Sequence, residues 1–310
     1  MAPLPQPTQP TIDAIYRAYE AAREPGRPHL GASVIGKECE RALWYSFRWA
    51  TAVKHSGRVL RLFERGQREE EVFNANLRAA GVEVLEVDPR TGRQFNFSAH
   101  GGHFGGAMDA AALGIIEAPK TWHVCEFKTS SNKLFEKLKK EGVEHAKPEH
   151  AAQMQCYMHW SGMTRAFYLV VNKDTDELYS ERVRYDKAYG EAILAKAHRI
   201  ITASEPPPRI SERPDWYVCR FCDHHATCHG GQIPEINCRT CCHSTPEMDG
   251  NARWSCAWLH CDVPVEIQRR GHECPHHRFI PAMMPWKAVD ASAEDNWILY
   301  ENGWKNGGEE

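Results

Sequence analysis

The distribution of cysteines is the feature that most constrains how this chain can fold. Nine of the twelve cysteines lie between Cys219 and Cys274, and several histidines are interspersed with them. In an intracellular protein such clusters indicate metal binding rather than disulfides. The stretch 234–285 is too short to fold on a hydrophobic core of its own. We therefore predict that the last third of the chain folds around metal sites.

The remaining composition is typical of a soluble globular protein. The chain has 310 residues, 42% of them hydrophobic, enough for one large domain and a smaller second one. It contains no long apolar run, and MAPLPQPTQP at the start lacks a signal-peptide pattern. We expect a cytoplasmic protein without membrane contact. The net charge of −3 gives no overall basic field, so contact with nucleic acid must rest on local basic groups.

The middle of the chain alternates between helical and strand patterns. Apolar spacing predicts helices over residues 11–23 and 59–80, the second stopped by Gly81. Short runs between turn residues predict an antiparallel meander of strands over 82–87, 94–97, 107–116 and 122–127. Later helices are expected over 132–141, 148–160 and 187–204, and strands over 166–172 and 178–185. This order predicts an α/β fold with a mixed sheet.

Two short motifs carry the candidate chemistry: Gly105-Gly106-Ala107-Met108-Asp109 and Cys125-Glu126-Phe127-Lys128. Side chains alternate along a strand, so Glu126 and Lys128 share one face. Asp109 on a neighbouring strand can converge with Glu126 on one Mg²⁺, which prefers a few carboxylates and retains water. Such an ion stabilises charge at phosphorus, and a lysine can orient the attacking water or assist its deprotonation. A Glu-x-Lys tripeptide alone is more often a surface ion pair, so the wider pattern decides.

Four motifs in order resemble the PD-(D/E)XK nuclease superfamily. They are Gly66-x-x-x-Glu70, Asp109, Glu126-x-Lys128 and Gln153-x-x-x-Tyr157, within residues 30–230. The first is similar to the helical motif of phage-type exonucleases, and the last to an element of the RecB-type branch. The resemblance implies a restriction-endonuclease-like core, in which helices flank a mixed central sheet.

The resemblance also implies a role for each matching residue. Asp109 and Glu126 would ligate Mg²⁺ or Mn²⁺ together with the backbone carbonyl of Phe127. Glu70 would complete the metal shell through water, with Glu69 or Glu71 as alternatives if the register of that motif differs. The proline that gives the family its name is absent before Asp109, a position at which family members often vary.

Three further residues acquire roles from the same resemblance. Lys128 would be the catalytic lysine. Gln153 and Tyr157 lie one helical turn apart, so both can face the site and contact the DNA backbone or Lys128.

A first cysteine set consists of Cys219-x2-Cys222-x5-Cys228, with Cys39 as the best candidate for a fourth ligand. An early cysteine followed by an arginine and an aromatic pair, with three late cysteines, resembles the iron–sulfur exonucleases of CRISPR adaptation and of AddAB-type helicase–nucleases. The resemblance implies a 4Fe–4S cluster that staples the two ends of the nuclease domain. Structural zinc is the alternative, bound by the same cysteines or with one replaced by His224, His225 or His229.

A second cysteine set follows, and for it we predict zinc bound by Cys238, Cys241, Cys256 and Cys274. The first pair has the spacing of a zinc knuckle. The alternatives are that some of these cysteines are free thiols or that nearby histidines complete the site. Trp254, Trp258 and Arg253 either form the small core of this module or stack on single-stranded DNA, and we favour the small core.

The predicted organisation is an N-terminal extension over residues 1–29, a nuclease domain over 30–232, a zinc-binding module over 233–285 and a polar tail over 286–310. The predicted activity is Mg²⁺- or Mn²⁺-dependent hydrolysis of DNA, exonucleolytic by family analogy. A phage origin is expected, with phage or host recombination or replication proteins as partners. The alternatives are a non-catalytic, metal-stabilised DNA-binding or assembly protein that retains the fold, and a hydrolase whose chemistry lies at the C-terminal zinc.

Overall fold

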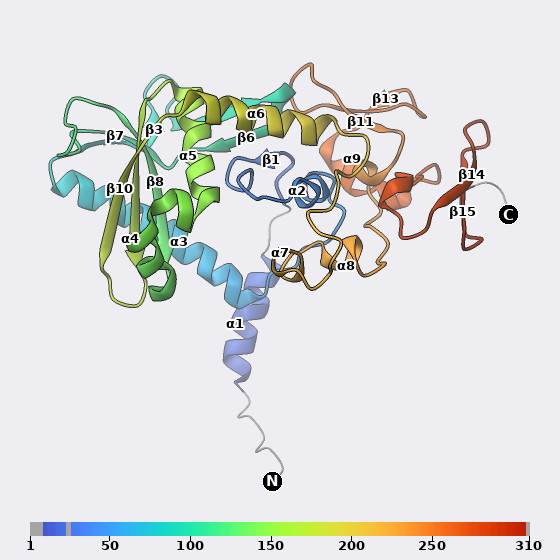
Figure 1. Ribbon diagram of the computed structural model, residues 1–310, viewed down its shortest axis with the longest axis horizontal. Coiled ribbons are helices and arrows are strands. Elements are labelled where there is room, and N and C mark those ends of the chain that lie inside the picture. The colour runs from blue at the N-terminus through green and yellow to red at the C-terminus, as the bar shows by residue number, and fades with distance from the viewer. Residues whose placement is uncertain (1–8, 23–25, 308–310) are drawn as a thin grey trace, which may run out of the picture.

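The computed structural model describes residues 9–22 and 26–307, arranged as Figure 1 shows. At its centre lies a five-stranded sheet in the order β10-β9-β8-β7-β2. Its strands are β2 (Glu83–Leu85), β7 (Ala110–Leu113), β8 (His123–Ser130), β9 (Arg165–Asn172) and β10 (Leu178–Arg184). Strands β8 and β9 are parallel, whereas the other neighbours are antiparallel. The predicted α/β class, with a mixed central sheet flanked by helices, is therefore confirmed.

The two faces of the central sheet are packed by different helices. Phe127 and its neighbours on one face contact Phe73 of α3 (Gly57–Ala79). The opposite face carries Val124 and Tyr168, and its core includes residues of α4 (Asn132–Ala146), α5 (Pro148–Ser161) and α6 (Lys187–Thr202). Because side chains alternate along β8, Glu126 and Lys128 belong to the same face as Val124. The predicted shared face of these two residues thus lies on the side of α5.

A second, three-stranded sheet leads the chain to Asp109. Its order is β1-β6-β5, with β1 (Leu30–Gly31), β5 (Asn96–Ala99) and β6 (Phe104–Ala107). The predicted single strand 107–116 is divided here, because β6 ends before Asp109 and β7 begins after it. Glycine is required at Gly106, where a Cβ would lie 2.7 Å from the hydroxyl of Tyr157. The break lets the Asp109 side chain meet the backbone of β8.

Helix α2 (Glu40–Phe47) was not predicted from the sequence, for a physical reason. It has only eight residues, and four consecutive ones (Ala42, Leu43, Trp44 and Tyr45) are buried, so a helical period of apolar and polar residues is difficult to recognise in its sequence. Helix α4 runs past its predicted end at Glu141, across a kink at Gly142. Helix α1 (Pro10–Ala21) packs against α3, and β3 (Val87–Asp88) pairs with β4 (Arg93–Gln94).

The C-terminal third consists of short elements. They are α7 (Tyr217–Arg220), α8 (His225–Cys228), α9 (Val265–Arg269), β11 (Ser244–Pro246), β12 (Trp254–Cys256) and β13 (Cys261–Asp262), with single 3-10 turns at Cys238–Thr240, Gly271–Glu273 and Pro281–Met283. A further 3-10 turn, His100–Gly102, lies earlier in the chain, between β5 and β6. The segment expected as a polar tail also forms strands, namely β14 (Ala288–Ser292), β15 (Trp297–Tyr300) and β16 (Lys305–Gly307). Figure 1 shows β14 and β15 at the edge of the molecule.

The cysteine-rich segment (residues 233–285) shares its core with the rest of the protein. Trp254 is 1% exposed and belongs to the main hydrophobic core, so it packs inside the protein as a core residue, but in the main core and not in a small core of the segment's own. Backbone contacts join the segment to the turn before β6, where the amide of Ala252 donates to the carbonyl of Gly101 at 2.7 Å. No helix among residues 9–22 and 26–307 is long and apolar enough to cross a membrane.

Candidate active site and metal centres

Asp109, Glu126 and Lys128 converge where β7 pairs with β8. The pairing of Ala110 with Cys125 places Asp109 beside the Glu126–Phe127 peptide. The amide of Phe127 donates a hydrogen bond of 2.8 Å to Oδ2 of Asp109. Lys128 Nζ pairs with Oε1 of Glu126 and donates to the carbonyl of Phe127 at 3.0 Å. The structure thus brings the predicted direct ligands and the predicted lysine together.

Glu70 joins this group from α3. Its pKa is raised to about 7 by burial and by the negative charge of Asp109, while Lys128 opposes the shift. Of the alternatives within the same motif, Glu71 is exposed and Glu69 only half-buried. The electrostatic proximity of Glu70 to Asp109 favours Glu70 as the helical carboxylate.

The electrostatics of the group indicate a deficit of positive charge. Glu126 is 0% exposed, and its Oε2 has no hydrogen-bond partner in the structure. Burial raises the pKa of Glu126, an effect that Lys128 opposes and Asp109 reinforces. The pKa of Asp109 is also raised, chiefly by burial. The pKa of Lys128 rises although burial alone would lower it, because Glu126 and Asp109 attract its charge. Several buried carboxyl groups facing one ammonium fit a divalent cation with oxygen ligands.

The side chains are not yet arranged as a coordination shell. In the described part of the chain, no group of three or more His, Cys, Asp or Glu side chains is placed so that it could hold a metal ion. Lys128 instead contacts Glu126 and the Phe127 carbonyl, two of the predicted ligands. We expect cation binding to displace the lysine ammonium from these oxygens.

Affinity for the catalytic metal should rise with pH. Because the pKa of Glu70 is about 7 and that of Glu126 is raised, these groups carry protons at low pH that metal binding must release. We therefore expect Mn²⁺ binding to tighten from about pH 6 to about pH 8, with net proton release. Calorimetric titration in buffers of different ionisation enthalpy measures both quantities. Affinity independent of pH over this interval would contradict the assignment of Glu70 and Glu126.

Gln153 and Tyr157 of α5 lie against the same carboxylates. Nε2 of Gln153 donates to the hydroxyl of Tyr157 at 3.3 Å, and both side chains are buried. The pKa of Tyr157 is raised by burial, with contributions from the charges of Glu126 and Asp109. The structure therefore brings this predicted pair to the site.

Two residues near the site were not identified from the sequence, His150 and Tyr168. Tyr168 of β9 is the ladder partner of Glu126, and its hydroxyl shares a hydrogen bond of 2.7 Å with Nδ1 of His150. Burial and the positive charges of Lys128 and Lys147 lower the pKa of His150 to about 3, so its imidazole is neutral at physiological pH. His150 precedes Gln153 by one helical turn, a spacing that could have revealed it. Tyr168 lies within an apolar strand and gives no such signal.

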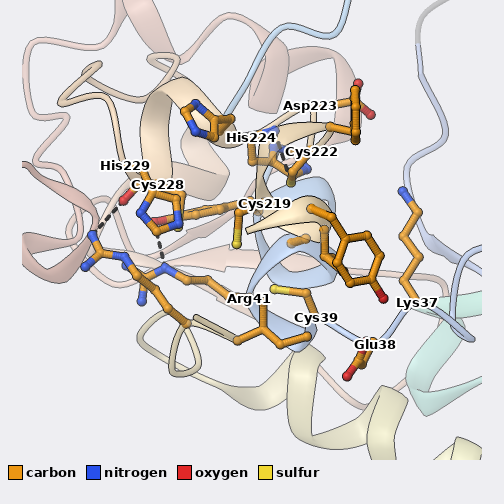
Figure 2. Close-up of a pocket in the computed structure, with 18 of the residues that line it drawn as sticks. Lys37, Glu38, Cys39, Arg41, Cys219, Cys222, Asp223, His224, Cys228 and His229 are labelled. Carbon is orange, nitrogen blue, oxygen red and sulfur yellow. Dashed lines mark hydrogen bonds between the residues drawn. The ribbon is translucent and has the colours of Figure 1, made fainter. Parts of the chain in front are cut away.

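The first cysteine set surrounds a cavity of about 350 Å³, and Figure 2 shows its lining side chains. Cys39 is the N-cap residue of α2, whereas Cys219 and Cys228 belong to α7 and α8. The pKa of Cys219 is raised by burial and by the neighbouring thiols of Cys39 and Cys228. Burial and Cys39 likewise raise the pKa of Cys222. The four predicted ligands therefore line one cavity, although Cys39 is far in sequence from the other three.

Among the alternative histidine ligands of this cavity, His224 is already engaged. Its Nε2 is hydrogen-bonded to Ser46 at 2.8 Å and its Nδ1 to Thr51 at 3.1 Å. A ring with both nitrogens in hydrogen bonds has no free lone pair for a metal. This geometry favours the four-cysteine set over a set that includes His224.

The second cysteine set lines another cavity, of about 260 Å³. The predicted ligands Cys238, Cys241, Cys256 and Cys274 are all at its wall, together with Cys261. Burial and the other four thiols raise the pKa of Cys238 to about 12. Cys261 was not among the predicted ligands, but strand pairing places it opposite Cys256. Either residue of this pair can therefore supply one thiolate.

Comparison with known proteins gives no family assignment. No protein-family model matches the chain, nor does any curated protein. Three similar solved structures share only low identity and limited overlap. SSO0001 is 13% identical, with a TM-score of 0.41 over 70% of this chain and 96% of its own. LHK-Exo in complex with dAMP is 17% identical, with a TM-score of 0.40 over 60% of this chain and 89% of its own. A further structure, of the alkaline exonuclease LHK-Exo from Laribacter hongkongensis, is 18% identical. Its TM-score is 0.38, and the match covers 59% of this chain and 90% of its own.

Proposed function

We propose that this protein is a metal-dependent DNA nuclease with its centre at Asp109, Glu126 and Lys128, completed by Glu70. The observation that carries the proposal is the fully buried Glu126, with Oε2 lacking a hydrogen-bond partner, between Asp109 and Lys128. An isolated set of buried carboxylates is costly, and a bound divalent cation removes most of that cost. A lysine beside such carboxylates supplies a second positive group for phosphodiester hydrolysis, in addition to the metal.

The roles of the residues follow from their positions. Mg²⁺ or Mn²⁺ held by Asp109, Glu126 and the Phe127 carbonyl would stabilise negative charge on the phosphate and lower the pKa of water. Lys128, once released from Glu126, orients the attacking water through its ammonium group, and its positive charge favours loss of a proton from that water to the solvent. The resulting hydroxide oxygen bonds to phosphorus, the bond from phosphorus to the oxygen of the leaving strand breaks, and that oxygen takes a proton from solvent. Gln153 and Tyr157, next to the carboxylates, position the scissile phosphate.

The proposed substrate is the end of a DNA strand, and the setting is DNA recombination, replication or processing by phage or host proteins. The test compares linear and covalently closed circular DNA with Mg²⁺, Mn²⁺ or EDTA. We expect linear DNA to be degraded with either metal, circles to persist, and EDTA to stop the reaction. Cleavage of circles would make the protein an endonuclease. Failure to cleave either substrate with both metals would contradict a nuclease.

We further propose that Cys39, Cys219, Cys222 and Cys228 hold a 4Fe–4S cluster and that the second cysteine set holds zinc. The gathering of the first four thiols around one cavity supports a tetrathiolate centre, for which zinc is the alternative occupant. Iron, sulfide and zinc analysis after anaerobic purification tests both assignments. We expect iron and sulfide with one zinc per chain, and two zinc ions without iron would overturn the cluster.

A further inference from the structure

A large cleft lies between α3, β1 and the cysteine-rich segment, and it borders the first cysteine cavity, with which it shares Lys37, Asp223 and His224. It has a volume of about 1060 Å³, and Trp49, Phe63 and Arg269 are among its lining residues. Its other charged or titratable lining residues are Arg27, His29, Lys37, His55, Asp223, His224 and Glu235. The cleft therefore combines residues from both ends of the sequence.

Helix α3 connects this cleft with the candidate active site. Phe63 lines the cleft, and Glu70 lies seven residues further along the same helix. At a rise of about 1.5 Å per residue, the two positions are about 10 Å apart along the helix axis. The floor of the cleft includes β1, which pairs with β6, the strand that precedes Asp109. A polymer chain that occupies the cleft can thus reach the carboxylates within a few monomers.

Arginines gather at the cleft and behind its wall. Arg27 and Arg269 line the cleft, as do the carboxylates Asp223 and Glu235, whereas Arg48 and Arg239 are buried behind the lining. Electrostatic repulsion links the four arginines. Arg239 is repelled by Arg48 and Arg269, and His29 lies close enough to feel the charges of Arg27 and Arg239. Their hydrogen bonds go to neutral oxygens, such as the carbonyls of Phe47 and Pro28 for Arg239 and that of Gly26 for Arg269. Within residues 9–22 and 26–307 none of these four arginines forms an ion pair with Asp or Glu. Such a cluster favours an anionic ligand.

Two aromatic side chains, those of Trp49 and Phe63, also line the cleft. The guanidinium groups of Arg239 and Arg269 lie 3.7 Å and 4.3 Å from the ring centroid of Trp49, which holds Arg269 in place at the wall. Phe63 is 49% exposed, and its ring meets that of His55 edge-on at 5.1 Å. An exposed aromatic ring beside arginines suits an unpaired nucleobase attached to a phosphate backbone.

We propose that this cleft binds a single DNA strand beside the bond to be cleaved, with Arg269 contacting a backbone phosphate and Phe63 stacking on a base. The inference rests on the proposed nuclease function and adds a substrate-binding role for α9. The separation of about 10 Å along the helix axis corresponds to a few nucleotides of a single strand. Stacking on Phe63 requires an unpaired base, so the strand in the cleft is single.

The test uses Arg269→Gln with Arg270→Gln as its matched control. Arg270 is the next residue, carries the same charge, and pairs with Glu273 away from the cleft. Binding of a fluorescein-labelled oligothymidylate of about twelve nucleotides is followed by anisotropy without divalent metal. We expect Arg269→Gln to weaken binding about tenfold and to lower the salt slope by about one, with Arg270→Gln unchanged. Equal affinities for the two variants would overturn the proposal.

A second variant keeps the test valid if Arg269→Gln disturbs folding. Phe63→Ala alters an exposed side chain and should weaken single-strand binding about tenfold. Wild-type affinity in Phe63→Ala would contradict base stacking in the cleft. Parallel cleavage assays with Asp109→Asn separate the two hypotheses. If DNA binding depends on Arg269 but the wild-type protein does not hydrolyse DNA, the nuclease function is contradicted and the binding cleft is supported. If the protein hydrolyses DNA but binding does not depend on Arg269, the binding cleft is contradicted and the nuclease function stands.

Discussion

Replacing Lys128 with methionine should lower the rate of DNA cleavage by about 10²- to 10⁴-fold. The side chain is 28% exposed, and its ammonium is in contact with Glu126 and the Phe127 carbonyl. Methionine keeps much of the length but removes the charge that would orient water and stabilise the charge developing at phosphorus. Initial rates on end-labelled linear DNA at saturating Mn²⁺ measure the effect. Lys139→Met is the control, because Lys139 lies on α4, where it pairs with Glu136 and Glu177 and lies over the ring of Phe135, and none of these residues belongs to the candidate site.

Measuring metal binding by Lys128→Met shows whether Lys128 acts in catalysis or in forming the metal site. Since the ammonium of Lys128 contacts two predicted ligands, its removal should leave Mn²⁺ affinity equal to or higher than that of the wild-type protein. Retained metal binding with lost cleavage supports a catalytic lysine. Cleavage at the wild-type rate would remove Lys128 from the mechanism, and lost metal binding would give it a structural role.

Substituting Cys39 with serine should produce the largest loss of stability. The residue connects the start of α2 to the cavity formed by α7 and α8, so a metal centre there closes a very long loop. By analogy with crosslinks of that length, the closure stabilises the folded state by about 5 kcal/mol. We expect the melting temperature to fall by about 10 °C or more, together with loss of the bound metal. Thermal unfolding followed by circular dichroism and metal analysis measures both.

Cys156→Ala provides the comparison for this experiment. Cys156 is buried in α5 and lines neither cysteine cavity. Its replacement removes one buried sulfur atom and should cost about 1 kcal/mol. If Cys39→Ser and Cys156→Ala melt at the same temperature with the same metal content, the first cysteine set holds no stabilising metal.

The predictions that rested on periodic residue spacing were the reliable ones. Side chains alternate along a strand, which predicted that Glu126 and Lys128 share one face. In the structure the two side chains of β8 are in contact on the same face. The spacing of Gln153 and Tyr157 on α5 placed both at the site in the same way. These inferences depend only on local geometry, which neighbouring residues determine. The same approach did not identify α2, a short helix in which four consecutive residues are buried.

Long-range contacts were the part that the sequence could not reveal. The hydrogen bond between His150 and Tyr168, the position of Cys261 opposite Cys256, and the stacking of Arg269 on Trp49 all depend on how distant segments meet. The boundary predicted at residue 233 marks a change in composition. The main core nevertheless continues across it through Trp254.

The measurement that tests the central claim most directly is cleavage of labelled linear DNA by Asp109→Asn with Mn²⁺. Asparagine has nearly the same shape and keeps an oxygen that can accept the hydrogen bond from the Phe127 amide, so the fold should persist. It removes the negative charge that the metal requires. Our account predicts cleavage no faster than that of the wild-type protein in EDTA, with an unchanged circular dichroism spectrum. Cleavage by Asp109→Asn at the wild-type rate would contradict it.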